Sequence, residues 1–132
     1  MPNDHMTKRV LIADDSSLMR RSVRGILESQ TDIEVCGEAQ DGLDVISKAS
    51  ELNPDLIILD LSMPRMHGLE AGHILKEMMP AVPLVLFTAH REVLRESDVI
   101  RSGVSAIVSK TEGTDVLLKA VQNLCRARPT SS

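Results

Sequence analysis

The feature that most constrains the fold is a run of four apolar residues, Leu56-Ile57-Ile58-Leu59, which lies between Asp55 and Asp60. A short unbroken apolar run is typical of a strand buried on both faces, as in a parallel sheet covered by helices. Such a strand tolerates a carboxylate only where it ends. Because ligands bind at the carboxyl ends of strands in open α/β sheets, Asp60 is predicted to lie at a functional site.

Apolar runs of this kind recur along the chain, and each is followed by a longer stretch with helical spacing. Five such pairs predict one doubly wound α/β domain with a five-stranded parallel sheet. A closed eight-fold barrel would need roughly twice this length. The run at 33–38 alternates apolar and polar residues, which indicates a position near a sheet edge. The predicted strands are Val10–Ala13, Ile33–Glu38, Leu56–Leu59, Leu84–Phe87 and Ala106–Val108.

Helical patterns fill the segments between these strands. Ser16 or Ser17 can cap the first helix, and Asn53-Pro54 signals the end of the second. The fourth helix has a weak apolar stripe and is expected to stop at Gly103. The predicted helices cover the stripe from Met19 to Leu27, the segment 43–52, the stripe from Ala71 to Met78, roughly 92–102, and the stripe from Leu117 to Leu124.

Length and composition exclude several classes of function. A chain of 132 residues fits one domain with its own core. The net charge of −4 comes without a basic stripe for nucleic acid, and Phe87, the only aromatic residue, offers no platform for base stacking. No apolar run approaches the ~20 residues that span a membrane. Cys36 and Cys125 lie far apart and indicate ordinary reduced thiols.

These observations favour a cytoplasmic domain over residues 8–125. Residues 1–7 lack the apolar stretch of a secretory signal and are predicted to be a flexible N-terminus. Residues 126–132 are predicted to be a disordered tail or the start of a linker.

Polar side chains follow four of the five predicted strands. Asp14 and Asp15 follow the first, Asp60 the third, Thr88 the fourth and Lys110 the fifth. If the sheet is parallel, all of these side chains point into one cleft. The sequence therefore predicts a site with three carboxylates, one hydroxyl and one ammonium group.

This combination suits phosphoryl chemistry at a carboxylate. Two carboxylates ~5 Å apart repel each other by about 3 kcal/mol at an effective dielectric constant of ~20. A hard divalent cation relieves this repulsion, and Mg²⁺ typically takes one or two carboxylates together with phosphate oxygens. Asp60 stands alone on its strand end and is the best nucleophile, which leaves Asp14 and Asp15 for the metal. Lys110 and Thr88 then face an anionic oxygen.

With these residues the chain resembles the receiver domain of a two-component response regulator, over essentially 8–124. The resemblance implies a flavodoxin-like (βα)5 three-layer sandwich. A further stretch resembles receivers of the NarL/FixJ type, found as single-domain chains or at the N-terminus of longer regulators. The motifs of the receiver are Ile12-Ala13-Asp14-Asp15-Ser16, 55–64, Gly68, Thr88-Ala89 and Lys110, and the NarL/FixJ-like stretch is 35–42.

The resemblance implies a role for each metal-site residue. Asp60 would accept a phosphoryl group from a histidine kinase or a phosphotransfer protein. Asp15 and Asp60, with the backbone carbonyl of Ser62, would hold Mg²⁺ or Mn²⁺, and Asp14 would help through a bound water. His90 and Ser62, each two residues after a site residue, are expected at the mouth of the site.

The resemblance also implies how the signal leaves the site. Thr88 would bond one phosphoryl oxygen and Lys110 would pair with another. The face built from the fourth helix, the fifth strand and the fifth helix would then repack for a downstream protein partner or for a phosphorylation-dependent homodimer. In this scheme the phosphoryl group adds a charge of roughly −1.5 to −2, which shifts the equilibrium of an element that has two conformations. No contact of this chain with nucleic acid or membrane is expected.

Two positions depart from the family pattern. Ile107 stands three residues before the lysine, where the family usually has Tyr or Phe, and Thr111 follows the lysine in place of the usual proline. Neither change touches the phosphorylation chemistry, but both concern the path to the output face. They motivate an alternative function, a phosphorylation-independent interaction module with the receiver fold.

A metal-dependent phosphatase that works through an aspartyl phosphate is a third interpretation. Such enzymes of the haloacid-dehalogenase type carry Asp-x-Asp at the end of their first strand, whereas here the nucleophile follows the third strand. Ser62 stands two residues after it, without a carboxylate. We therefore expect no enzyme activity beyond self-phosphorylation and self-dephosphorylation.

Overall fold

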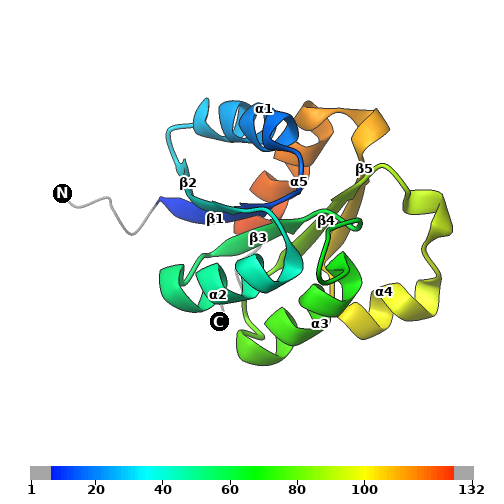
Figure 1. Ribbon diagram of the computed structural model, residues 1–132. Helices are drawn as coiled ribbons and strands as arrows, with labels where there is room; N and C mark the ends of the chain where they lie inside the picture. Colours follow the sequence, from blue (N-terminus) through cyan, green and yellow to red (C-terminus); the bar gives the residue numbers. More distant parts are fainter. Residues whose placement is uncertain (1–6, 127–132) are drawn as a thin grey trace.

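A parallel sheet forms the centre of the computed structural model, which describes residues 7–126 (Figure 1). Within that range five strands lie in the order β2-β1-β3-β4-β5, and every neighbouring pair is parallel. The predicted doubly wound α/β fold is confirmed. The strands are β1 (Lys8–Ala13), β2 (Ile33–Ala39), β3 (Leu56–Leu59), β4 (Leu84–Thr88) and β5 (Ala106–Ser109).

Helices cover both faces of the sheet, which makes three layers (Figure 1). α1 and α5 lie on one face, and α2, α3 and α4 lie on the other. The helices are α1 (Ser17–Glu28), α2 (Gly42–Leu52), α3 (Gly68–Met78), α4 (Glu96–Ser102) and α5 (Thr114–Arg126), with short 3-10 helices η2 (Arg91–Val93) and η3 (Lys110–Glu112).

The strands supply two apolar layers, because successive side chains of a strand point to opposite faces. Val10 and Ile12 of β1 pack on the side of α1 and α5, whereas Leu11 and Ala13 pack on the side of α2 and α3. All four residues of β3 are buried, as their apolar run predicts. The prediction that the alternating strand lies at a sheet edge is also confirmed, since β2 is the outermost strand next to β1.

Local signals mark one boundary each of three helices where the sequence indicates. Ser16 is the cap of α1, and its Oγ accepts a hydrogen bond from the Met19 N–H at 3.1 Å. α2 stops at Asn53, whose φ of 51° is left-handed and which precedes Pro54. Gly103 ends α4 with φ of 76°, a conformation that favours glycine.

The predicted fourth helix over 92–102 is wrong in its first half. Arg91–Val93 form a 3-10 turn, and Leu94 and Arg95 then adopt extended backbone with ψ of 135° and 144°. The partly buried Leu94 packs against the apolar layer of the α2 and α3 face. An extended backbone carries Leu94 into this layer, so the α-helix begins only at Glu96.

The predicted chain ends are tested only in part. Arg126, expected to open the tail, is the last residue of α5. The predictions for 1–6 and 127–132 fall outside the described residues. In the part of the chain that the structure describes, no helix has the length and apolar character to cross a membrane.

Candidate functional site

The carboxylates of the site come from the ends of β1 and β3, which are neighbouring strands. Asp14 follows β1, and its Oδ1 accepts a hydrogen bond from the Ser16 N–H at 2.9 Å. Asp60 follows β3, and its own N–H donates to the Ala13 carbonyl at 2.9 Å. Both acidic strand ends are therefore hydrogen-bonded to the short segment 13–16 at the end of β1.

Gly68 shows how closely the next helix approaches this strand end. A Cβ atom at position 68 would lie 2.2 Å from the Asp60 carbonyl oxygen. Its N–H donates to the Leu61 carbonyl at 2.9 Å. Only glycine fits here without a backbone shift, so the first residue of α3 fixes the backbone of Asp60.

The three carboxylates converge as predicted from the strand ends. Asp14, Asp15 and Asp60 each offer an oxygen within 4.8 Å of the others. The side chains of Asp14 and Asp60 are nearly enclosed, with 3% and 6% of their residue surface exposed, whereas Asp15 is exposed. The cluster thus has two buried anions and one anion at its mouth.

Lys110 reaches this cluster from the end of β5. Its Nζ lies 2.8 Å from Asp14 Oδ2 and 3.5 Å from Asp60 Oδ1. Lys110 opens η3, which Ser109 caps together with Glu112 in a capping box. Thr111, which stands where the family usually has proline, is part of this turn, and its N–H donates to Ser109 Oγ at 3.2 Å.

Burial and a neighbouring carboxylate shift the pKa of Asp60, the nucleophile candidate, in the same direction. Burial, and then the neighbouring Asp14 carboxylate, raise the pKa of Asp60 above its ordinary value. Lys110 and the Ser62 N–H, which donates a hydrogen bond to the carboxylate, only partly oppose this. The raised pKa means that the anionic form of Asp60 is under-compensated by the protein alone. Hard carboxylate oxygens with excess negative charge are a donor set that fits Mg²⁺.

Thr88 lies at the end of β4, beside β3, and is fully buried. Its Oγ1 accepts a hydrogen bond from the His90 N–H at 3.0 Å. A hydroxyl that accepts in this way still has its own proton to donate. Thr88 is therefore linked to the loop that leads toward α4. His90 and Ser62 are both exposed.

Residues that sequence reasoning missed also hold the loops of the site. Arg65 binds the buried Asp41 with two nitrogens, Nε to Oδ2 at 3.1 Å and Nη2 to Oδ1 at 3.3 Å. This bridge ties the loop after Asp60 to the cap of α2. The left-handed φ of 68° at Arg65 marks a constrained loop. No sequence signal connects these two residues, which lie 24 positions apart.

The family model of the response regulator receiver domain matches residues 10–122. The chain belongs to the response regulator receiver family. Among curated proteins it is similar to the response regulator protein VraR of Staphylococcus saprophyticus. The identity is 36% over 117 residues, or 89% of this chain and 56% of the relative. The receiver chain thus spans little more than half the length of such relatives.

Solved receiver structures have the same fold. The signal receiver domain of a response regulator described as NarL, from Mycobacterium tuberculosis, matches with a TM-score of 0.80 and 26% identity, over 92% of this chain and 98% of the other. The isolated receiver domain of RcsB from Salmonella enterica, determined with phosphomimetic BeF3⁻, matches with a TM-score of 0.83 and 26% identity. That match covers 96% and 94% of the two chains.

Proposed function

We propose that Asp60 is the phosphoacceptor of this receiver and takes its phosphoryl group from a histidine kinase or a phosphotransfer protein. The observation that carries the proposal is the buried Asp60 carboxylate with its raised pKa, set among Asp14, Asp15 and Lys110. A carboxylate oxygen of Asp60 bonds to phosphorus while the bond from phosphorus to the donor imidazole nitrogen breaks. The electron pair of that bond stays on the leaving imidazole.

A divalent cation, Mg²⁺ or Mn²⁺, fits the carboxylate cluster. Asp15, Asp60 and the Ser62 backbone carbonyl would hold it, and Asp14 would contribute through a water. When bound, the cation neutralises charge on the phosphoryl oxygens. The protein contributes the rest: the close packing of Gly68 holds the backbone of Asp60, and the Ser16 N–H holds the Asp14 carboxylate.

Lys110 and Thr88 would read the phosphorylated state. Lys110 lies between Asp14 and Asp60, where its charge can pair with a phosphoryl oxygen. The Thr88 hydroxyl would donate to another. If Thr88 turns toward the phosphoryl group, its bond to the His90 N–H breaks and the loop before α4 is released. A charge added at Asp60 would in this way reach a segment of the surface.

The output would be a change in protein binding on the face of α4, β5 and α5. Ile100 of α4 is 72% exposed. Ile107 of β5 is partly buried and packs against the same apolar layer as Leu94. A downstream protein partner or a second copy of the chain are the two forms of output we propose. We place this function in the cytoplasm, where histidine kinases deliver their phosphoryl groups.

Beryllofluoride binding followed by ¹⁹F NMR tests the proposal. With Mg²⁺, wild-type protein should give a bound beryllofluoride signal that disappears in the absence of the cation. Asp60→Asn should give none. No bound signal in wild type, or an equal signal in Asp60→Asn, would overturn the phosphoacceptor role and favour the phosphorylation-independent module.

A further inference from the structure

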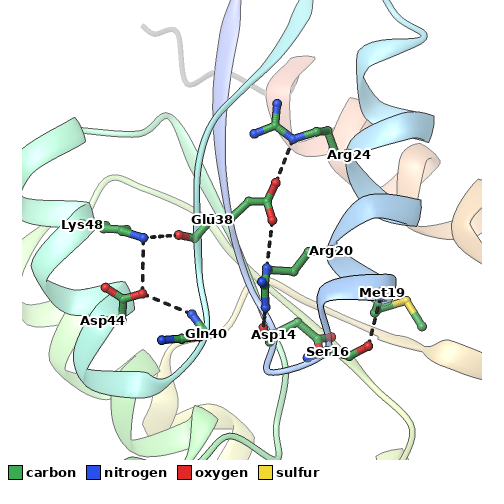
Figure 2. Close-up of polar contacts among 9 residues, drawn as sticks. All are labelled: Asp14, Ser16, Met19, Arg20, Arg24, Glu38, Gln40, Asp44 and Lys48. Carbon is green, nitrogen blue, oxygen red and sulfur yellow. Dashed lines mark hydrogen bonds and ion pairs between the residues drawn. The ribbon is translucent and has the colours of Figure 1, made fainter.

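Arg20 of α1 links Asp14, at the end of β1, to the edge strand β2 (Figure 2). Its Nη1 donates to the Asp14 backbone carbonyl at 2.6 Å, and its Nε donates to Glu38 Oε1 at 2.8 Å. The side chain is only 16% exposed. One planar guanidinium therefore joins the end of β1 to β2, a geometry that lysine cannot reproduce.

Glu38 is itself held firmly on its strand. Arg24, one turn further along α1, donates from its Nε to Glu38 Oε2 at 2.8 Å, and Lys48 of α2 donates to the Glu38 carbonyl (Figure 2). Burial of Glu38 would raise its pKa, but hydrogen bonds from Arg24 and Arg20 outweigh burial and hold the pKa below its ordinary value. Glu38 is thus an ionised anchor for the Arg20 side chain.

The Asp14 carbonyl belongs to the peptide bond that leads to Asp15. A peptide unit is planar, so the carbonyl oxygen of Asp14 and the Cα atom of Asp15 move together. The Asp14 N–H is bonded to the Ala39 carbonyl at 3.0 Å. With Arg20 on the carbonyl, both sides of Asp14 are fixed, and this sets the direction in which the exposed Asp15 leaves the backbone.

We propose that Arg20 is a positioning residue for the divalent-cation site, acting through the Asp14 carbonyl on the Asp15 carboxylate. The inference rests on the proposed function, since it assumes that Asp15 binds the cation. Partners behind the direct ligands commonly change metal affinity by about 10–100-fold when they are removed.

Charge alone predicts the opposite effect. Arg20 is a cation beside the cluster, so its removal should strengthen binding of Mg²⁺ if only electrostatics mattered. Removal should weaken binding if Arg20 positions Asp15. Arg24 is the matched control on the chain, because it contacts the same Glu38 carboxylate at the same 2.8 Å and has no contact with Asp14 among the described hydrogen bonds.

Calorimetric titration of the whole chain with MgCl₂ tests the proposal. Arg20→Gln should weaken Mg²⁺ binding about tenfold, Arg20→Lys should weaken it less, and Arg24→Gln should stay within about twofold of wild type. Without metal, amide hydrogen exchange at Asp15 and Ser16 should accelerate in Arg20→Gln and stay unchanged in Arg24→Gln. If Arg20→Gln does not fold, Arg20→Lys and Glu38→Gln carry the same comparison.

The outcomes separate the two proposals. Wild-type protein that does not bind Mg²⁺ would overturn the proposed function and the role of Arg20 together. Wild-type protein that binds Mg²⁺, with Arg20 variants that bind as tightly as Arg24→Gln, would overturn the role of Arg20 alone.

Discussion

β3 divides the sheet into a β1 and β2 side and a β4 and β5 side, and different contacts hold the helices on these two sides. On the side of β1 and β2, α1 and α2 both begin with side-chain caps, Ser16 and Asp41, and Arg20 and Arg24 bind one carboxylate of β2. On the side of β4 and β5, α4 has seven residues and begins after Arg95 without a side-chain cap hydrogen bond in the described structure. We call the β1 and β2 side, which these side-chain contacts fix, the braced side. We call the β4 and β5 side, with its short α4, the loosely held side.

This difference matches the proposed function, which requires a rigid cation site and a separate element that can change conformation. A cation site gains from ligands whose positions are fixed before binding. A switch needs an element of low local stability whose equilibrium a small change can bias. Lys110, at the end of β5, reaches across to the other side through its ion pairs with Asp14 and Asp60. The Thr88 to His90 hydrogen bond then joins the end of β4 to the loop before α4.

The largest effect is expected where the first residue of α3 packs against the end of β3. Gly68→Ala should destabilise the fold by about 3 kcal/mol, because its Cβ would lie 2.2 Å from the Asp60 carbonyl oxygen. Gly25→Ala is the control, since a Cβ there meets nothing within 4 Å. That change should stabilise α1 by about 0.5–1 kcal/mol. Urea unfolding of both variants checks this, and equal midpoints would contradict the close packing at Asp60.

A smaller effect is expected at Asp60, the proposed phosphoacceptor. Without Mg²⁺, Asp60→Asn should stabilise the protein by about 1 kcal/mol, or roughly 3–5 °C in Tm, because a buried and repelled charge is removed. Mg²⁺ should stabilise wild type more than the variant. A lower Tm for Asp60→Asn in the absence of metal would show that the carboxylates are not crowded.

The same residue predicts a pH dependence with a definite sign. The folded protein holds the Asp60 proton more tightly than the unfolded chain, since the folded pKa is raised. Stability therefore falls as pH rises from the unfolded value through the folded one, and the full penalty is present above it. The Tm advantage of Asp60→Asn should be larger at neutral pH than near pH ~4, where Asp60 of wild type carries its proton to a greater extent than an ordinary aspartate. A constant difference would contradict the raised pKa.

The smallest effect on stability is expected on the loosely held side. Ile100→Ser should change the free energy of unfolding by less than about 0.5 kcal/mol, because its side chain is 72% exposed. If this face binds the partner, the variant should still weaken beryllofluoride-dependent capture of that partner. Val23→Ala, on the buried face of α1, is the contrast and should cost about 1–2 kcal/mol.

The convergence of the site was predictable because it depends on strand ends alone. A parallel sheet brings Asp14, Asp60 and Lys110 together whatever the details of the helices, and the structure confirms this. The bracing was not predictable. Arg20 meets Glu38 across 18 positions of chain and Arg65 meets Asp41 across 24, so each pair depends on tertiary packing. Neither pair has a local sequence motif.

The break before α4 was missed for a related reason. The weak apolar stripe over 92–102 is compatible with helix throughout. The inward packing of Leu94 decides the matter, and that contact is made with the layer under α2 and α3. Helical periodicity reports which residues share a face of one helix, but it does not report a residue that leaves the helix to reach the core.

Amide hydrogen exchange with and without beryllofluoride and Mg²⁺ tests the central claim, that Asp60 controls the loosely held side. In wild type, exchange over 89–102 should change severalfold, while that of the helical part of α1 should change little. In Asp60→Asn, exchange over 89–102 should stay the same with and without beryllofluoride and Mg²⁺. Unaltered exchange over 89–102 in wild type that binds beryllofluoride, or the same change in Asp60→Asn, would contradict the account.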